Sequence, residues 1–463
     1  MNDPAALALT SSTPVLSHAL PRAFLVAASL LVLGCEPSSQ TGDASASAWQ
    51  GTVVEEGLTL TVRTTGGSVW GGDGRLIEEL AIGTETRGEN DMLARVFGME
   101  ATEDRIFVLD QTLGTVRVYD SAGQHVLDIG RRGEGPGEFG SITDLGIDPV
   151  RQQLVVREGR GVLHRFTLSG EFVGRTSFNS PMSISGAGLL LRVTRSGEAI
   201  IYHVVHRGWA QALASGRLPP RTDLLYTVAP DGTLTDSLDL PISNDEPNIM
   251  KAWVNPGTYR PEPVPFAPQK VWSIGRDGAF IFGVSADYRF EIRYPDGRTT
   301  VIEREADPAP VLPGEKAWAA DRVWAIMRNF EPKWAWDGPE IPATKAWYSA
   351  IIPDRSGRIW VLREGEGRRV EDWTEPDDWR GWKDDLAWMP ERWFDVFEEA
   401  TGRYLGRVDA PEDLSPEPEP VIDGDRFICL TLDEFDRPIV RRYRLELPES
   451  KPAPRVVSTP RPV

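Results

Sequence analysis

The sequence predicts an all-β protein, a six-bladed β-propeller whose blades are four-stranded antiparallel sheets and whose ring is closed by an N-terminal strand. Two observations lead to this fold class. Helical periodicity is scarce after residue 50, and short apolar runs are separated by Gly, Asp and Pro turns, as in all-β chains. The runs also repeat six times in one order, and repeated groups of four short strands indicate a propeller. A large β-sandwich or two stacked β-domains is the alternative.

The second strand of each repeat is an almost continuous apolar run, which indicates that both of its faces are buried between blades. Third strands such as TVRVYD alternate more, as half-exposed strands do. Glycine follows Asp231 and Asp296 where a hairpin needs a positive φ. The second strands are RIFVLD from Arg105, QLVVRE from Gln153, EAIIYH from Glu198, AFIFGV from Ala279, RIWVLR from Arg358 and RFICLT from Arg426.

The sixth repeat lacks a fourth strand, because the chain becomes Pro-rich from residue 448. An apolar alternating segment, LTLTVRT from Leu58, stands near the other end of the chain. We expect this segment to complete the last blade, since such closure removes two open sheet edges.

The N-terminal segment is typical of a bacterial lipoprotein signal. An apolar run over residues 23–34 follows Arg22 and ends in VLGC, so that Cys35 is the expected lipid-bearing residue, carrying acyl chains such as palmitate. The run is shorter than the roughly 20 residues of a membrane-spanning helix. A chance cysteine beside an ordinary signal peptide is the alternative. Glu36 stands where an Asp would favour the inner membrane in known lipoprotein sorting, so the outer membrane is favoured.

These features divide the chain into four parts. We expect a signal peptide over residues 1–34, a flexible tether over 35–52, the propeller over 53–447 and a disordered tail over 448–463. The net charge of −19 argues against a nucleic-acid partner. Once Cys35 carries lipid, Cys429 has no disulfide partner, and its apolar surroundings in FICLTL predict a buried, inert thiol.

The segment GRRGEGPGEF, residues 130–139, with the strands that follow it, resembles an NHL repeat. In that pattern a G-x-G-x-G-x-F stretch links one blade to the next. The chain is therefore similar to exported six-bladed propeller lipoproteins of bacteria over about residues 95–175. The resemblance implies a six-bladed ring with a central channel but no single activity. GPGEFG also matches G-x-G-x-x-G, but a strand follows it instead of the helix that a dinucleotide site needs, and we expect Phe139 to fill the space between blades.

Two sets of residues are candidates for partner binding. Arg131 and Arg132 could hold a carboxylate or phosphate by bidentate hydrogen bonds, although a solvated mixed-charge loop is the simpler interpretation. The second set lies in a long insertion of blade five, residues 366–393, which must sit at a rim of the ring. Its tryptophans can stack on sugars, anchor a protein partner, or pack the insertion onto the rim; the candidates are Trp373, Trp379, Trp382 and Trp388.

Two further long loops, residues 244–269 and 303–342, are Pro-rich and aromatic. Together with the blade-five insertion they could roof one end of the channel. The sequence thus favours a monomeric, lipid-anchored, non-enzymatic module that binds a protein or polysaccharide of the cell envelope.

No cofactor, bound metal or catalytic residue is predicted. His203 and His206 lie three residues apart in a strand, so their rings point to opposite faces. The alternative function is a metal-dependent hydrolase or lyase acting at the channel mouth, as in other six-bladed enzymes. Asp110, Glu158 and Asp287 lie near strand ends and are its candidate ligands.

Overall fold

The computed structural model describes residues 48–84, 92–159, 161–178, 190–206, 221–240, 248–255, 258–371, 373, 387–433 and 435–448. Residues 46–463 form one compact unit, and the fold below is that of its described part. The predicted lipid-attachment residue Cys35, the insertion residues Trp379 and Trp382, and the tail beyond residue 448 lie outside the described residues.

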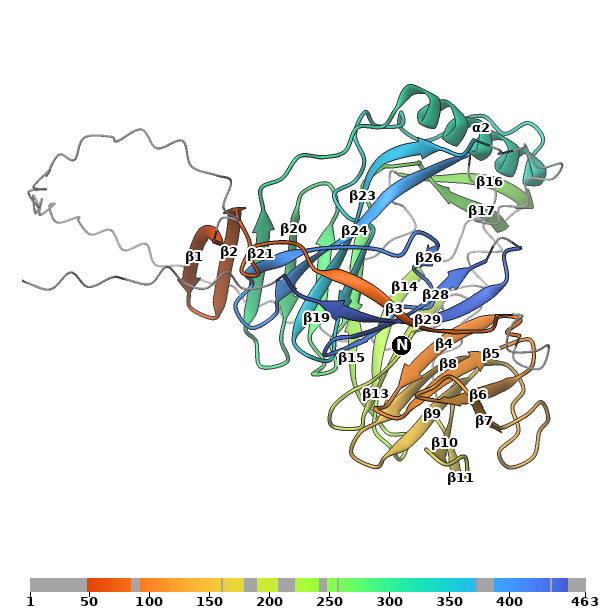
Figure 1. Ribbon diagram of the computed structural model, residues 1–463. Helices are drawn as coiled ribbons and strands as arrows, with labels where there is room; N and C mark the ends of the chain where they lie inside the picture. Colours follow the sequence, from red (N-terminus) through yellow and green to blue (C-terminus); the bar gives the residue numbers. More distant parts are fainter. Residues whose placement is uncertain are drawn as a thin grey trace, which may run out of the picture. The chain divides into compact units, whose positions relative to one another are not determined.

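Six antiparallel sheets follow one another along the chain, which confirms the six-bladed propeller (Figure 1). Blade 1 contains β4 (Val96–Ala101), β5 (Arg105–Asp110), β6 (Thr115–Asp120) and β7 (His125–Ile129). Blade 2 contains β8 (Ile142–Asp148), β9 (Gln153–Glu158), β10 (Val162–Thr167) and β11 (Phe172–Ser177). Blade 3 contains β12 (Leu191–Val193), β13 (Ala199–His206), β14 (Arg221–Val228) and β15 (Leu234–Asp239).

The second half of the ring has the same order of strands. Blade 4 contains β18 (Lys270–Ile274), β19 (Phe280–Val284), β20 (Arg289–Arg293) and β21 (Thr299–Arg304). Blade 5 contains β22 (Ala350–Pro353), β23 (Arg358–Arg369), β24 (Trp388–Glu398) and β25 (Tyr404–Asp409). In blade 6 the innermost strand is split into β26 (Leu414–Ser415) and β27 (Val421–Asp423), and β28 (Arg426–Leu432) and β29 (Pro438–Glu446) follow.

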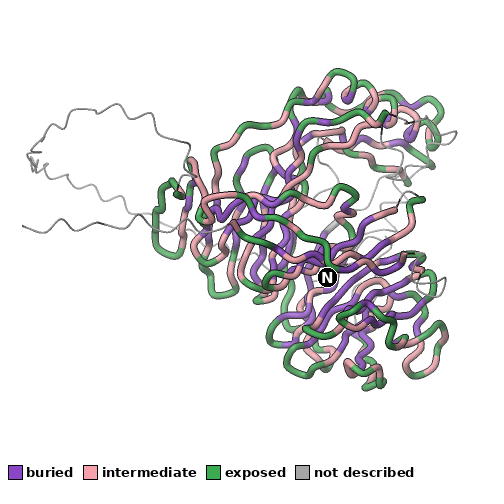
Figure 2. The backbone as a smooth tube through the Cα atoms, viewed as in Figure 1, coloured by how far each residue is buried: buried purple, intermediate pink, exposed green. Residues whose placement is uncertain are grey.

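A hydrophobic cluster fills every interface between consecutive blades, and another lies between blade 6 and blade 1. Between blades 5 and 6, for example, Trp360, Phe394 and Phe427 are fully buried with ring centroids 5.5–5.6 Å apart. Burial follows the strand order, since second strands are almost entirely buried whereas the outer strands β11 and β15 are exposed (Figure 2). The second strands were therefore predicted correctly as strands packed on both faces.

The strand that completes blade 6 differs from the prediction. The strand β3 (Arg75–Ile82) pairs with β29, whereas the segment expected there forms β2 (Thr59–Gly66). Instead, β2 lies parallel to β21 of blade 4 and pairs on its other side with β1 (Gln50–Glu56). Ion pairs support the pairing of β3 with blade 6: Glu78 accepts hydrogen bonds of 2.9 Å from Arg441 of β29, and Glu79 meets Arg442 and Arg444 of the same strand.

Two insertions form a small lobe that the sequence did not predict as a unit. The hairpin of β16 (Ile249–Asn255) and β17 (Thr258–Pro263) packs against helix α2 (Pro313–Phe330) around a core that includes Met250, Val323 and Trp334 (Figure 1). The helix begins with Pro at its first position, and the side chain of Glu315 accepts a hydrogen bond from the Leu312 amide. Within the described ranges, no helix has the length and apolar content needed to cross a bilayer.

Strand alternation places all the insertions at one end of the ring. In each blade the innermost and third strands run in one direction, and the second and outermost strands run in the other. The loop before each innermost strand and the loop between each second and third strand therefore lie at the same end of the ring. The β16–β17 hairpin precedes the innermost strand of blade 4, α2 precedes that of blade 5, and the blade-five insertion joins a second strand to a third. We call this end the insertion end, and the lobe of β16, β17 and α2 the insertion lobe.

Candidate functional site

The centre of the ring holds a cavity of about 730 Å³. Its walls come from the innermost strands of all six blades, including Met99, Leu145, Leu191, Trp272, Ile351 and Ile422. A volume of this size is in the range of small-ligand sites in proteins, which is about 300–1,000 Å³. The cavity is therefore the first candidate for a binding site.

Ion pairs cross the channel at the end opposite the insertions. Glu100 ends the innermost strand of blade 1, and its carboxylate accepts a hydrogen bond of 2.7 Å from Arg276 of blade 4. Arg355 of blade 5 donates to the other oxygen of the same carboxylate and, at 2.6 Å, to the carbonyl of Ala101. Blades 1 and 4 face each other across a six-membered ring, so these contacts hold the far end of the channel together.

A second cross-channel pair lies on the opposite diagonal. Nη2 of Arg192 in blade 3 donates to both carboxylate oxygens of Glu419 in blade 6, at 2.7 and 2.8 Å. Beside it, the carboxyl group of Asp144 accepts the backbone N–H groups of Leu145 at 2.8 Å and Leu191 at 2.5 Å. All six blades thus contribute a strand, a turn or a side chain to this polar layer.

Burial and neighbouring charges act differently on Asp144 and Glu100, two of the carboxyl groups of the cavity. Burial raises the pKa of Asp144 to about 7, although its two backbone hydrogen bonds and nearby arginines act against the change. Burial also opposes ionisation of Glu100, but Arg276, Arg355 and Arg192 outweigh it and hold the pKa below its usual range. At neutral pH, Glu100 is a carboxylate and Asp144 is partly a neutral acid.

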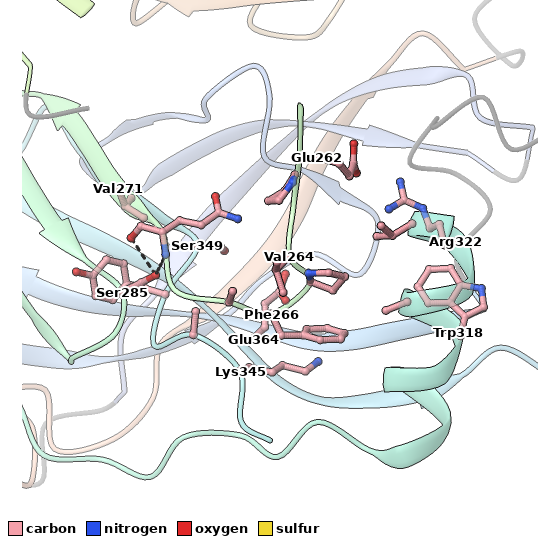
Figure 3. A pocket seen from close by; sticks show the side chains of 18 residues that line it. Glu262, Val264, Phe266, Val271, Ser285, Trp318, Arg322, Lys345, Ser349 and Glu364 are labelled. Atoms are coloured by element: carbon pink, nitrogen blue, oxygen red, sulfur yellow. Dashed lines mark hydrogen bonds between the residues drawn. The ribbon is translucent and has the colours of Figure 1, made fainter. Parts of the chain in front are cut away.

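A smaller hollow of about 320 Å³ lies under α2 at the insertion end (Figure 3). Trp318 and Arg322 reach it from α2, and Phe266 follows β17 (Figure 3). Lys345 lines it as well and forms a buried ion pair of 2.6 Å with Glu315 of the helix. Val271 and Ser349 line both this hollow and the central cavity, so the two spaces adjoin.

The outer surface of the insertion lobe exposes aromatic rings. Trp253 is 44% exposed and lies 5.4 Å, centroid to centroid, from Tyr259 across the hairpin. The ammonium group of Lys251 lies 5.3 Å from the Tyr259 ring centroid, and Phe330 at the end of α2 is 43% exposed. Aromatic rings beside cationic groups on a rim are suited to stacking on sugars or on a partner side chain.

The predicted arginine pair makes contacts within the protein: Arg131 within its own loop and Arg132 with the turn between β5 and β6. The guanidinium of Arg131 donates to Glu138 at 2.8 Å, and Arg132 donates to the carbonyls of Gln111 and Thr112. Phe139 fills the interface of blades 1 and 2, as expected for the G-x-G-x-G-x-F stretch, and is completely buried. Neither arginine lines the cavity or the hollow under α2.

The predicted tryptophan set is only partly described. Trp388 begins β24 and packs on the start of α2. Its ring lies so close to Gly314 of that helix that a Cβ there would be 2.7 Å from its Cζ2 atom. Trp373 is half-buried and makes contacts of its own. Trp379 and Trp382 lie outside the described residues. The insertion itself is shorter than its sequence suggested, since β23 continues to Arg369 and β24 already starts at Trp388.

The carboxylates named for a metal-dependent enzyme do not share a site. Asp110 caps backbone amides at Ala94 and Leu113, Glu158 contacts His164 and Gly140, and Asp287 is exposed in blade 4. Among the residues that the structure describes, no group of three or more His, Cys, Asp or Glu side chains is arranged to hold a metal ion. His203 is buried, and the side chain of His206 is outside the description.

The cavity arginines were not predicted, although the sequence contains a signal for two of them, Arg276 and Arg355. Three turns between a first and a second strand share the pattern Arg, then Ser or Asp, then Gly. They place Arg195, Arg276 and Arg355 at equivalent positions of blades 3, 4 and 5, and the three are linked at the far end of the channel. Aligning the repeats on their second strands shows this arginine at one structural position in three of the six blades.

The fold and the central cavity define a six-bladed β-propeller. Residues 82–185, which include blades 1 and 2, match a family described as a 6-bladed beta-propeller. No curated protein matches the chain.

Solved structures with a similar fold are distant in sequence. A member of the DUF4221 family from Bacteroides vulgatus is 9% identical, with 81% of this chain and 99% of that chain covered and a TM-score of 0.45. A protein of Bacteroides fragilis provisionally named as exported is 10% identical, with 80% and 94% covered and a TM-score of 0.40. Virginiamycin B lyase from Staphylococcus aureus is 11% identical, with 80% and 99% covered and a TM-score of 0.35.

Proposed function

We propose that this protein is an exported, monomeric binding module, anchored through Cys35 to the envelope with the outer membrane favoured, that captures a polysaccharide at its insertion end. The observation that carries the proposal is the hollow under α2, which adjoins the central cavity. Its wall combines the rings of Trp318 and Phe266 with the charged groups of Glu262 and Arg322, and sugar binding uses this combination of stacking and polar contacts.

The exposed aromatic surface of the insertion lobe supports the same end of the ring. Trp253 and Tyr259 lie outside the lobe core, so they are not needed to hold α2 on the hairpin. Two of the predicted tryptophans of the blade-five insertion, Trp373 and Trp388, are described and belong to this end as well, because that insertion joins a second strand to a third. A protein partner is the competing ligand class, since Trp also anchors protein interfaces.

A capture experiment tests the proposal. The detergent-solubilised full chain is immobilised and offered separately the polysaccharide fraction and the protein fraction of an envelope extract. We expect capture of polysaccharide, and its loss in the double variant Trp253→Ala/Tyr259→Ala with an unchanged thermal unfolding midpoint. A second double variant, Trp379→Ala/Trp382→Ala, tests the remainder of the insertion. Capture from the protein fraction alone, or capture that survives both double variants, would contradict the proposal.

Asp144 favours a second candidate, an enzyme that uses the central cavity. A buried carboxyl group with a pKa near 7 is in the range that general acid–base catalysis requires. Recovery and size analysis of the captured polysaccharide distinguish the binding module from the enzyme. A binding module returns it intact, whereas a hydrolase or lyase returns fragments at a rate that Asp144→Asn abolishes, and metal analysis of the purified chain would show whether a divalent ion takes part.

A further inference from the structure

Two arginines of the central cavity, Arg192 and Arg276, have N–H groups that donate to no residue in the described part of the chain. A guanidinium group has five N–H donors. Among the described residues, Arg192 uses only Nη2, and its Nε is buried without a hydrogen-bond partner. Arg276 likewise donates only through Nη2, to Glu100. Both side chains line the cavity and are 15% exposed, and neither Nη1 group donates a hydrogen bond within the described part of the chain.

The carboxylate oxygens of the same polar layer have little remaining capacity to accept hydrogen bonds. Both oxygens of Glu100, of Glu419 and of Asp144 already accept hydrogen bonds from the protein. Four arginines and four acids line the whole cavity, so formal charge alone does not select a ligand. The hydrogen-bonding groups do select one, because unused N–H donors of the guanidinium groups favour a ligand with hydrogen-bond acceptors.

We propose that the central cavity binds a carboxylate group of an acidic saccharide, through the unused donors of Arg192 and Arg276. A planar guanidinium group matches a carboxylate by two parallel hydrogen bonds, which makes this pair stronger than contacts to neutral hydroxyl groups. The inference rests on the proposed function, because the same insertion end gives the ligand its path, and it adds the chemical class of the saccharide.

The shape of the site favours an oligosaccharide over a small free acid. The hollow under α2 and the central cavity share Val271 and Ser349 in their walls, and the path that we propose for the ligand runs through both, from the insertion end to the arginines. Aromatic rings stand along it, with Trp318 at the outer part and Trp272 in the cavity wall. Such a path fits a linear saccharide whose rings stack at the rim while an acidic unit reaches the polar layer.

Calorimetric titration of the detergent-solubilised full chain tests the inference. The probes are oligogalacturonate, oligoglucuronate and oligomannuronate, each paired with its carboxyl-reduced, neutral counterpart of equal length. We expect at least one acidic probe to bind tenfold or more tightly than its neutral counterpart. Arg192→Lys and Arg276→Lys keep the positive charge that Glu419 and Glu100 require but remove the planar fork, and each should lower the affinity for the acidic probe roughly tenfold.

Control variants and alternative ligands make the outcome decisive. Arg298→Lys, in an exposed turn of blade 4, is the matched control and should leave the affinity unchanged. Equal affinity for acidic and neutral probes, no binding of any acidic probe, or tighter binding of a hexaglutamate peptide would overturn the inference. If neutral probes bind as well as acidic ones and Trp253→Ala/Tyr259→Ala abolishes both, the proposed function stands and this inference falls. Should both lysine variants unfold, the comparison of acidic with neutral probes on the unchanged chain still decides.

Discussion

Gly130 and Phe139 provide a quantitative test of the blade 1–blade 2 interface. Gly130 has φ of 72°, and a Cβ there would lie 2.1 Å from Cε2 of the fully buried Phe139 ring. Gly130→Ala therefore costs about 1–2 kcal/mol for the left-handed backbone and about 1–3 kcal/mol more because the ring must move. Phe139→Ala costs about 3–5 kcal/mol as a core deletion. In the double variant the ring is gone, so the alanine at position 130 should cost only its backbone term.

Urea unfolding of the wild type, both single variants and the double variant measures the coupling between the two positions. We expect a coupling free energy of about 1–3 kcal/mol, with the double variant more stable than the sum of the single losses predicts. Gly57→Ala is the control, because Gly57 has φ of 61° and nothing within 4 Å of the added Cβ. Gly57→Ala should lower the free energy of unfolding only by the cost of the left-handed backbone, with no coupling to Phe139→Ala. Additive losses at Gly130 and Phe139 would refute the packing described for this crossover.

Three further predictions concern buried polar groups. Asp395 is buried between Arg304, Arg363 and two tyrosines. Asp395→Ala should therefore lower the free energy of unfolding by about 3–5 kcal/mol, because it leaves the buried arginines without their partner. The exposed control Asp296→Ala should lower it by much less, and equal losses would contradict this prediction. Because the pKa of Asp144 is about 7 in the folded state and about 3.9 when unfolded, its ionisation should remove about 4 kcal/mol of stability as the pH rises from 4 through 7. The free energy of unfolding of Asp144→Asn, taken relative to that of the wild type, should be higher at pH 8 than at pH 5. Parallel pH profiles of the two proteins would contradict the raised pKa of Asp144. Cys429 is fully buried and burial raises its pKa, so in a Cys35→Ser chain a thiol reagent should react only on unfolding; rapid reaction of the native chain would contradict its placement.

The propeller was predictable because its second strands carry the signal themselves. A strand packed on both faces must be apolar throughout, so runs such as β5 and β28 identify their place without knowledge of their neighbours. Phe139 was predictable for a similar reason, since the glycines around it permit the close approach that its ring makes with Gly130.

Features that depend on a distant partner were not predictable from single segments. The segment of β2 alternates in sequence and that of β3 does not, yet β3 is the strand of blade 6. Its Leu80 and Ile82 pack into the core between blades 6 and 1, and its Glu78 and Glu79 meet arginines of β29. The cavity arginines were not predicted for the same reason, because Arg276 and Arg355 each appear in sequence as an ordinary charged turn and Arg192 as one charge in a short strand. The helix α2 did carry a local signal, since Ala319, Val323, Ile326 and Met327 form its buried face at helical spacing, but its Pro-rich surroundings suggested a loop.

Site-specific photocrosslinking at the two ends of the ring tests the central claim most directly. A photoreactive amino acid replaces Trp253 on the insertion lobe, and in a second chain replaces Val150, which is 60% exposed in the turn between β8 and β9 at the opposite end. After irradiation of whole cells, we predict an adduct with envelope polysaccharide from position 253 and none from position 150. Adducts from position 150 alone, or equally from both positions, would contradict ligand capture at the insertion end.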